Sequence, residues 1–305
     1  NDHEDAILAI ESIQKIKTKA KISVFVVDNA SSSDVSSIII KKFPKVTVIK
    51  LKKNIGTAAY DEAIKKTNAE YIYFTGSDVL FEKDMLDPLI KALENDEKVA
   101  LANPKGLTFD KKNIESGGTW LSRSFYSGKF KDNTLGNKNR EIPYRGTGLI
   151  RRSVIDGWGY LFDPEYFFYG EDVDLGLRLK LQGYKTVYVP SSIFYHKGSV
   201  SRKKFSGMKL TYLMERNLIR TFFTTLSFPR ILLYFPYVVL MRFVAMAFDL
   251  LKLHFGVIFS RIGGLFWVLL HLGIILKKRS QVQKRRKVSD SEVVKVFCER
   301  YLVRR

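Results

Sequence analysis

The chain has 305 residues, of which 46% are hydrophobic, which excludes a disordered protein and suffices for one large domain or two modest ones. Its single cysteine, Cys298, excludes an internal disulfide and a cysteine-based zinc site, so a reducing, cytosol-facing location is expected. The formal net charge of +20 points to an anionic partner, either a nucleic acid or a membrane.

The distribution of the basic residues favours the membrane. They are densest between residues 277 and 287, directly after a long apolar region, where the positive-inside rule and attraction to anionic lipids place them. No RNP-like, zinc-finger or recognition-helix signature accompanies the charge, so nucleic acid is not a predicted partner. A basic RNA-binding protein remains an alternative, which would show a steep, salt-dependent affinity for RNA.

The first hundred residues alternate between strand-like and helical patterns. Each apolar, β-rich run is followed by a polar loop and then by a segment with helical periodicity. This alternation predicts an α/β domain with an open, mostly parallel sheet flanked by helices. The expected helices cover residues 6–17, 34–42, 57–67 and 79–97, and the expected strands cover residues 22–27, 46–49, 71–74 and 99–102.

Polar residues follow three of these strands. Asp28 ends the first, Asn54 and Gly56 stand in the loop after the second, and Asp78 comes after the third. Because ligands bind at the carboxyl ends of the strands in such sheets, we expect these groups to share one edge. An aspartate there can accept a hydrogen bond from a base or hold a divalent cation beside a diphosphate, but a lone aspartate after a strand is also a common helix cap.

The middle of the chain carries fewer periodic signals. Residues 105–142 are rich in Gly, Ser, Lys and Asn and are interpreted as a long, mobile loop. Gly146 and Gly148 follow, where they either let the backbone approach a ligand closely or form a plain turn. A short strand is expected at residues 186–189.

A helix is predicted to begin at Glu171 and Asp172, although its alternating pattern alone also permits a strand. Acidic residues in the first turn, basic residues in the last and Gly183 after it favour the helix. Helix amides would help to keep Asp172 ionised, and an ionised aspartate can deprotonate a hydroxyl. A solvated helix start with no chemical role is the simpler interpretation.

Several stretches, in this order and spacing, resemble the family 2 inverting glycosyltransferases, and more narrowly their rhamnosyltransferase-like branch. They are VVDNASSSD at 26–34, NIGTAAYDEAI at 54–64, TGSD at 75–78, RGTGLIRRSVI at 145–155, FDPEYFFYGEDVDLGLRLKLQGYKTVYVPSSIFYH at 162–196 and ERN at 215–217. The resemblance implies a GT-A (Rossmann-like) fold over residues 1–217, a UDP-, dTDP- or GDP-sugar donor, and Mg²⁺ or Mn²⁺.

The resemblance also implies roles for single residues. Asp28 would bind the donor base, and the other donor-binding positions would be Asn54, Gly56, Asp78, Gly146 and Gly148. Asp78, at the last position of the family's DxD-type motif, would hold the metal on the diphosphate. Asp172 would be the general base, with Glu171 beside it. His196 would be a second metal ligand, or equally a histidine satisfied within the core.

The sequence departs from the family pattern in two ways. Gly76 and Ser77 precede Asp78, so the first aspartate of a full DxD motif is absent and strict metal dependence is not implied. The chain begins at Asn1, about where the family's first strand ends, so that central strand is predicted to be missing: either the true chain starts upstream or the sheet is built differently.

Residues 218–280 form a predicted membrane-associated helical region. Its apolar segments, 231–248 and 255–276, are near the ~20 residues needed to cross a bilayer, but they are interrupted at Arg242, Arg261 and His271. Interfacial helices and a spanning two-helix hairpin both remain open, and core helices of a soluble protein are a third possibility. Residues 281–305 are a basic tail with a short helix at 292–301.

The sequence therefore predicts an inverting glycosyltransferase at the cytoplasmic face of the cell membrane, in polysaccharide biosynthesis. It would move a sugar from a nucleotide-sugar donor to a hydroxyl of a glycan or lipid-linked acceptor. Direct displacement at the anomeric carbon needs a base opposite the leaving diphosphate and a cation to neutralise it, which are the roles of Asp172 and Asp78. The alternative is a catalytically inactive GT-A-fold membrane scaffold, consistent with the incomplete DxD motif and the missing strand.

Overall fold

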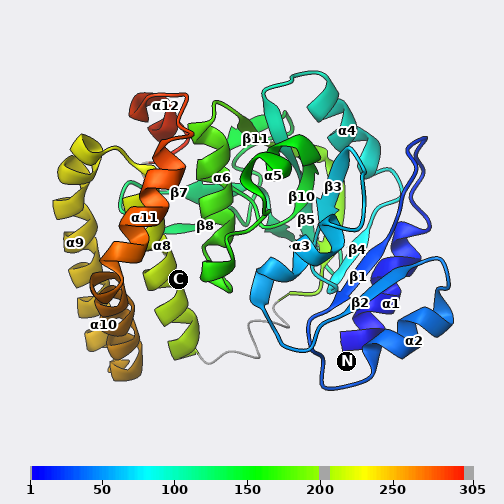
Figure 1. Cartoon of the computed structure of the whole chain (residues 1–305), viewed down its shortest axis with the longest axis horizontal. Coiled ribbons are helices and arrows are strands. Elements are labelled where there is room, and N and C mark those ends of the chain that lie inside the picture. Colours follow the sequence, from blue (N-terminus) through cyan, green and yellow to red (C-terminus); the bar gives the residue numbers. More distant parts are fainter. Residues whose placement is uncertain (1, 199–206, 299–305) are drawn as a thin grey trace.

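The computed structural model describes residues 2–198 and 207–298, which form an α/β body beside a layer of helices (Figure 1). The helices are α1 (Asp2–Ile13), α2 (Val35–Lys42), η1 (Gly56–Ala58), α3 (Ala59–Ile64), α4 (Leu86–Glu94), α5 (Arg152–Trp158), η2 (Pro164–Tyr166), α6 (Glu171–Leu181), α8 (Gly207–Thr225), α9 (Phe228–Leu251), α10 (Phe255–Leu270), α11 (Leu272–Gln283) and α12 (Asp290–Val294). The strands are β1 (Phe25–Asp28), β2 (Thr47–Lys50), β3 (Tyr71–Phe74), β4 (Val79–Phe81), β5 (Val99–Thr108), β6 (Ile114–Ser116), β7 (Thr119–Leu121), β8 (Ser127–Lys129), β9 (Arg140–Ile142), β10 (Gly148–Arg151) and β11 (Lys185–His196).

The α/β class is confirmed, with a main sheet whose strands run in both directions. Its order is β3-β10-β5-β11-β4, with β6 added to β5 and β9 added to β11. Parallel pairing joins β5 to β11 and, in a separate two-stranded sheet, β1 to β2. Strands β4 and β10 are antiparallel to their neighbours, because neither is reached through a crossover helix of the kind that parallel strands need.

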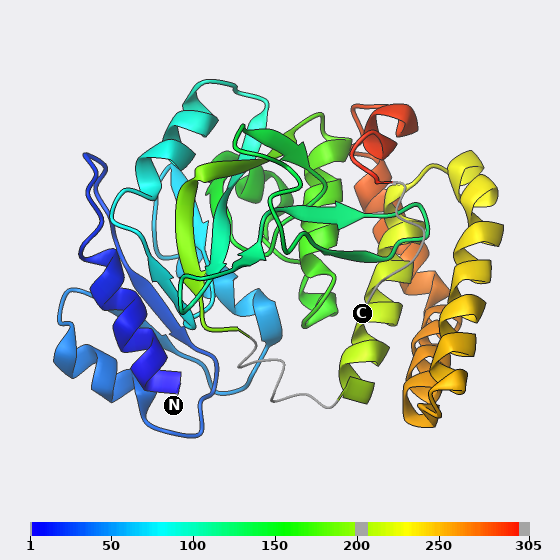
Figure 2. The same ribbon diagram turned by 180° about the vertical axis from the view of Figure 1, so that it is seen from behind.

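Strands β1 and β2 stand apart from the main sheet (Figure 2). Within the described part of the chain, β1 pairs with β2 alone and β3 with β10 alone, so each has one unpaired edge. A cavity of about 1070 Å³ is lined by residues of β1 and β3 and by the apolar side of α1. This cavity separates β1 from β3.

Residues 79–142 fold differently from the prediction. The predicted helix at 79–97 is strand β4 followed by α4, because residues 79–81 pair with the end of β11. The mobile loop predicted at 105–142 is wrong, since β5 continues to Thr108 and strands β6 to β9 follow. The strand predicted at 186–189 is also longer, because β11 continues through Pro190 to His196. Pro190 lies at a register shift where the ladder with β5 is interrupted, so its missing N–H is tolerated there.

Helix α6 forms as predicted and lies at the centre of the molecule. Nine of its eleven residues are buried, because β11, α8 and α12 all pack against it. A helix buried on nearly every side has no single apolar stripe, which explains why its sequence also alternates like a strand.

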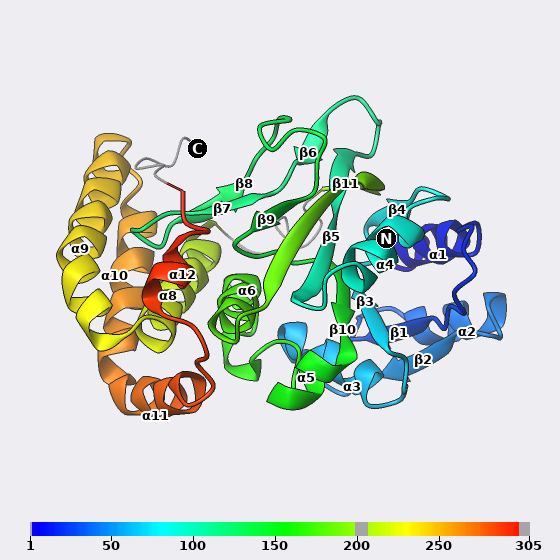
Figure 3. The ribbon, with the colours of Figure 1, turned by 90° about the horizontal axis from the view of Figure 1, so that it is seen from above.

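The C-terminal helices form a layer outside α6 (Figures 1 and 3). Helix α8 crosses the predicted domain boundary at residue 217 and lies between α6 and α10, while α9 lies beyond it against α10. Helix α11 bends away from α10 by 71°. The predicted tail helix at 292–301 is observed as the shorter α12, and residues 299–301 lie outside the described part.

Candidate active site

The pairing of β4 with β11 brings Asp78 and His196 together. Asp78 immediately precedes β4, and the register pairs Val79 with His196, the last residue of β11. The Lys197 amide donates a hydrogen bond to the Asp78 carbonyl at 2.9 Å. The Asp78 Oδ2 atom then lies 3.3 Å from His196 Nε2, so the two predicted metal ligands are neighbours.

Two further charged residues complete this cluster, and both come from the segment that was predicted to be a loop. Glu115 of β6 lies 3.5 Å from His196 Nδ1 and 2.6 Å from the ammonium of Lys129, on β8. Sequence reasoning missed both, because the three-residue strands β6 and β8 are too short to show a period. The nearest strand signal is the β-rich run Thr119–Leu121 between them.

The cluster favours a charged imidazole. Burial opposes the charge of His196, but hydrogen bonds and charges from Asp78 and Glu115 outweigh burial and raise its pKa to about 9. Burial likewise acts against ionised Glu115, and its contacts with His196 and Lys129 hold its pKa well below the usual range.

Asp172 lies in the first turn of α6, as predicted. Burial raises the pKa of its carboxyl, and the hydrogen bond from the Val173 amide and the charge of Lys129 only partly oppose that rise. Burial therefore outweighs the helix amides, which were expected to help keep Asp172 ionised. Its Oδ1 accepts the Val173 amide at 2.9 Å, and a Cβ placed on Gly146 would lie 3.4 Å from Oδ2. Gly146 thus lets the backbone pass close to this carboxylate.

Glu171 is a buried carboxyl group whose Oε2 has no hydrogen-bond partner among the described residues. Burial and the neighbouring charge of Asp172 raise its pKa to about 8. At neutral pH Glu171 is therefore mainly protonated, which leaves Asp172 as the member of the pair that ionises first.

Glu171 should make the stability of the protein depend on pH. Its folded pKa of about 8 lies above the unfolded value of 4.5, so its penalty is absent below pH 4.5 and grows as the pH rises toward 8. We expect E171Q to melt at a higher temperature than wild type at pH 9, and at nearly the same temperature at pH 5. Thermal unfolding checks this, with E94Q on an exposed glutamate as control; parallel curves for E171Q and wild type would contradict it.

The loop that carries Asn54 and Gly56, called the donor loop below, is organised by Asn29. Sequence reasoning did not single out this residue. Its side chain donates to Asn54 Oδ1 at 3.1 Å and to the Gly56 carbonyl at 3.0 Å, and accepts the Ile55 amide at 2.9 Å. Asn29, Asn54 and Gly56 are among the residues that line the cavity between β1 and β3. Because a Cβ on Gly56 would lie 2.0 Å from the Phe167 carbonyl oxygen, only glycine fits there.

Two predicted donor-binding residues are engaged in local structure. The carboxylate of Asp28 is buried and accepts the Ser31 amide at 2.8 Å and the Ser36 hydroxyl at 2.7 Å, as a cap of its own loop. Gly148 opens β10 at a φ of 154°, and a Cβ there would lie 2.6 Å from the Ala102 carbonyl oxygen of β5. Packing within the sheet accounts for this glycine.

Comparison with known proteins places these features in a family. Residues 4–158 match the model of glycosyl transferase family 2. The N-acetylglucosaminyl-diphospho-decaprenol L-rhamnosyltransferase of Mycobacterium tuberculosis is 25% identical over 215 residues, which are 60% of this chain and 69% of that protein. An uncharacterized glycosyltransferase of Rickettsia felis is 34% identical over 91 residues, which are 29% of this chain and 15% of that one.

Solved structures show the same fold. GalNAc-T7 with UDP, GalNAc and Mn²⁺ superposes with a TM-score of 0.53 at 15% identity, over 63% of this chain and 40% of that chain. The 1–349 fragment of S. aureus TarS in complex with UDP gives a TM-score of 0.51 at 16% identity, over 73% and 63%. This chain thus spans less than two thirds of either. Since the family model covers more than half of the sequence, the chain belongs to glycosyl transferase family 2, with a GT-A fold and a rhamnosyltransferase-like sequence.

Proposed function

We propose that the protein is an inverting glycosyltransferase that moves a rhamnosyl or other hexosyl group from a nucleotide-sugar to a hydroxyl of a glycan or lipid-linked acceptor. The observation that carries this is that Lys129 links a partly buried aspartate, Asp172, to the Asp78–His196 pair. Lys129 pairs directly with Glu115, which contacts His196, and its charge acts on the carboxyl of Asp172. These contacts support a proposed base and a proposed diphosphate site that are linked through Lys129.

Asp172 would act as the base. Its Oδ1 is occupied by the Val173 amide, so Oδ2, beside Gly146, is the atom that would take the proton of the acceptor hydroxyl. As the acceptor oxygen bonds to the anomeric carbon, the bond from that carbon to the diphosphate breaks and the configuration inverts. A raised pKa makes Asp172 a stronger base than an exposed aspartate, which favours this proton transfer.

Asp78 and His196 would hold Mg²⁺ or Mn²⁺. A carboxylate oxygen and a neutral imidazole nitrogen are suitable ligand types for such an ion, and here the two atoms lie 3.3 Å apart. Because His196 is mainly protonated without a metal, it would have to release its proton when the ion binds. No group of three metal-binding side chains occurs in the described ranges, which fits an ion that also takes oxygens from the donor diphosphate. When bound, the cation would neutralise charge on the departing nucleoside diphosphate.

A panel of donors tests this proposal. UDP-, dTDP- and GDP-sugars are titrated calorimetrically with and without Mn²⁺ into wild type and D78A, with D156A on an exposed aspartate as control. We expect Mn²⁺ to tighten binding of one donor, and D78A to lose at least about tenfold in that affinity. Equal enhancement in D78A would remove Asp78 from the metal site. Absence of binding for every donor would favour the inactive scaffold, which the incomplete DxD motif also allows.

The helical layer would attach the enzyme to a membrane, because its polarity is inverted relative to that of a soluble protein. Helix α9 is long and apolar enough to cross a bilayer, and only 22% of its most apolar window is buried, which argues against a core helix. Its buried side carries Arg242 and Asp249. Its exposed side, and that of α10, carry large apolar residues, among them Leu232, Leu233, Leu240, Phe243, Phe259, Phe266 and Leu269.

The charges within the layer are paired with one another. Glu215 of α8 forms ion pairs with Arg242 and Arg261, and Arg261 Nε lies 2.7 Å from Asp249 Oδ2. The basic residues that seemed to interrupt the apolar segments therefore face inward. They leave the outer face of α9 and α10 without their charge, as contact with lipid requires.

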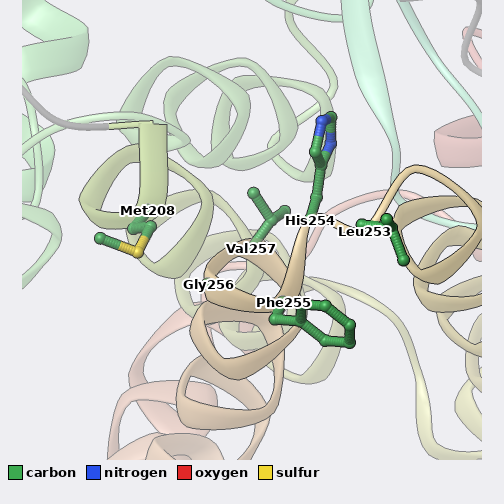
Figure 4. Close-up of a pocket in the computed structure, with 6 residues that line it drawn as sticks. All are labelled: Met208, Leu253, His254, Phe255, Gly256 and Val257. Carbon is green, nitrogen blue, oxygen red and sulfur yellow. The ribbon is translucent and has the colours of Figure 1, made fainter.

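The arrangement favours helices that lie on the membrane. Helix α10 packs against α8, and α8 packs against α6, so a bilayer has access to the outer side of α9 and α10 (Figure 1). Helix α10 has 16 residues, about 24 Å at 1.5 Å per residue, which is short of a ~30 Å hydrocarbon core, and α11 then turns away. At the turn after α9, a shallow pocket of about 460 Å³ lies between Met208 and residues 253–257 (Figure 4).

Exposed basic residues support the cytoplasmic face. Lys277 lies on α11, Lys284, Arg285 and Lys287 follow it, and all four are exposed. Such a group is attracted to the anionic lipids of the cytoplasmic leaflet. A site held at that surface is suited to a lipid-linked acceptor, the kind of substrate that the name of the mycobacterial relative indicates for that protein.

A further inference from the structure

The segment that precedes Asp172 has an unusual backbone. Phe167, Tyr169 and Gly170 have φ values of 63°, 62° and 84°, and two of these residues carry side chains that disfavour this region. Non-glycine residues stay at positive φ only when their surroundings hold them there. Residues 166–170, called the strained loop below, therefore need an external support.

The support comes from Asn217, in the middle of α8. This side chain is fully buried, and its Nδ2 is directed at the carbonyl oxygens of Tyr166 at 3.1 Å, Phe168 at 3.1 Å and Tyr169 at 2.5 Å. A Cβ on Gly170 would lie 3.0 Å from Asn217 Cβ, so the helix and the strained loop are in close contact. One amide group thus engages three carbonyls of the loop.

The two residues before Asn217 connect it to the rest of the helical layer. Arg216 donates to the Tyr166 carbonyl at 2.8 Å, and its guanidinium lies 5.0 Å from the ring centre of Trp267 on α10. Glu215 holds Arg242 and Arg261 of α9 and α10. Three consecutive residues therefore fix the strained loop to α8 and α8 to the membrane-facing helices.

The other side of the strained loop contacts the donor loop. The Thr57 amide donates to the Phe167 carbonyl at 2.9 Å, and Gly56 packs against the same oxygen. The strained loop therefore lies between the donor loop and Glu171–Asp172 at the start of α6. A shift in it would move the base, whereas Asn54 and Gly56 have a separate anchor in Asn29.

We propose that Asn217 is a positioning residue, which holds the strained loop so that Asp172 faces the acceptor, and that Arg216 couples this support to the helical layer. The inference rests on the proposed function, because it concerns the placement of the proposed base. Asn217 itself does not touch the reacting atoms. Its loss should lower kcat with little change in the KM for the donor.

N217D is the sharpest variant, because it has the same shape but directs a carboxylate oxygen at the three carbonyls. Since a misplacement of about 1 Å can cost about 100-fold in rate, we expect kcat to fall by about 100-fold and the donor KM to change less than about threefold. T211A, which removes a hydrogen bond to the Gly207 carbonyl at the start of the same helix, should behave as wild type. N217S, which keeps one donor, should lie between.

Hydrogen exchange separates this inference from the proposed function. Amides of residues 167–173 should exchange at least about tenfold faster in N217D than in wild type or T211A, whether or not turnover is detected. If N217D exchanges faster but the wild-type protein shows no turnover, the proposed function is overturned, while the role of Asn217 in supporting the strained loop stands. Unchanged exchange and kcat in folded N217D would overturn the support, and should N217D not fold, N217S decides by the same two readouts.

Discussion

Replacement of Asp172 by asparagine is expected to reduce sugar transfer by about 10²- to 10⁴-fold, the usual contribution of a positioned general base. Asparagine keeps the size of the side chain and can still accept the Val173 amide hydrogen bond, so the start of α6 should be preserved. What is lost is the oxygen that takes the proton. The measurement is the rate at which nucleoside diphosphate is released from the donor found by calorimetry, in the presence of acceptor.

Two controls make this result interpretable. D156N changes an exposed aspartate on α5 and should leave the rate unchanged. Donor affinity and membrane binding of D172N should equal those of wild type, because neither depends on the base. A D172N variant with full activity would show that another group accepts the proton, and Glu171, buried beside it, would then be examined first.

Removal of three exposed phenylalanines from the helical layer is expected to abolish binding to lipid vesicles. Phe243 of α9 and Phe259 and Phe266 of α10 are 62%, 72% and 57% exposed, whereas Arg242 and Arg261 of the same helices are buried. Burial of each in lipid contributes about 1.5 to 3 kcal/mol. The triple change to serine should therefore weaken binding on the order of a thousandfold or more.

Flotation with vesicles of phosphatidylcholine and phosphatidylserine measures this binding. A matched control replaces three exposed apolar residues of the α/β body, Leu8, Ile40 and Phe109, with serine and should float like wild type. The two triple variants should remain folded by circular dichroism. Equal flotation of both would contradict the assignment of the membrane-facing surface.

The sequence was sufficient to predict the parts of the site that lie next to regular elements. The positions of Asp78 and Asp172 in the fold were predicted, because Asp78 follows a β-rich run and Asp172 lies at the start of a helix with clear start and end signals. Their partner His196 was open between two interpretations, and the pairing of β4 with β11 brings it to Asp78.

The sequence could not predict contacts that depend on long-range pairing. Glu115 and Lys129 lie on three-residue strands, which are too short to show a period and become strands only by pairing with β5 and β7. Arg242 and Arg261 looked like interruptions of membrane segments for the same reason. Their partner Glu215 lies on another helix, and periodicity within one helix carries no information about that partner.

The central claim, that this chain transfers a sugar with inversion, is tested most directly by the anomeric configuration of the first product. Wild-type protein on vesicles is given its α- or β-configured donor and a lipid-linked acceptor, and the new glycosidic bond is examined by NMR. We expect a product of the opposite configuration, formed by wild type and not by D172N. A product that retains the donor's configuration, or no product with any donor of the panel, would contradict the account.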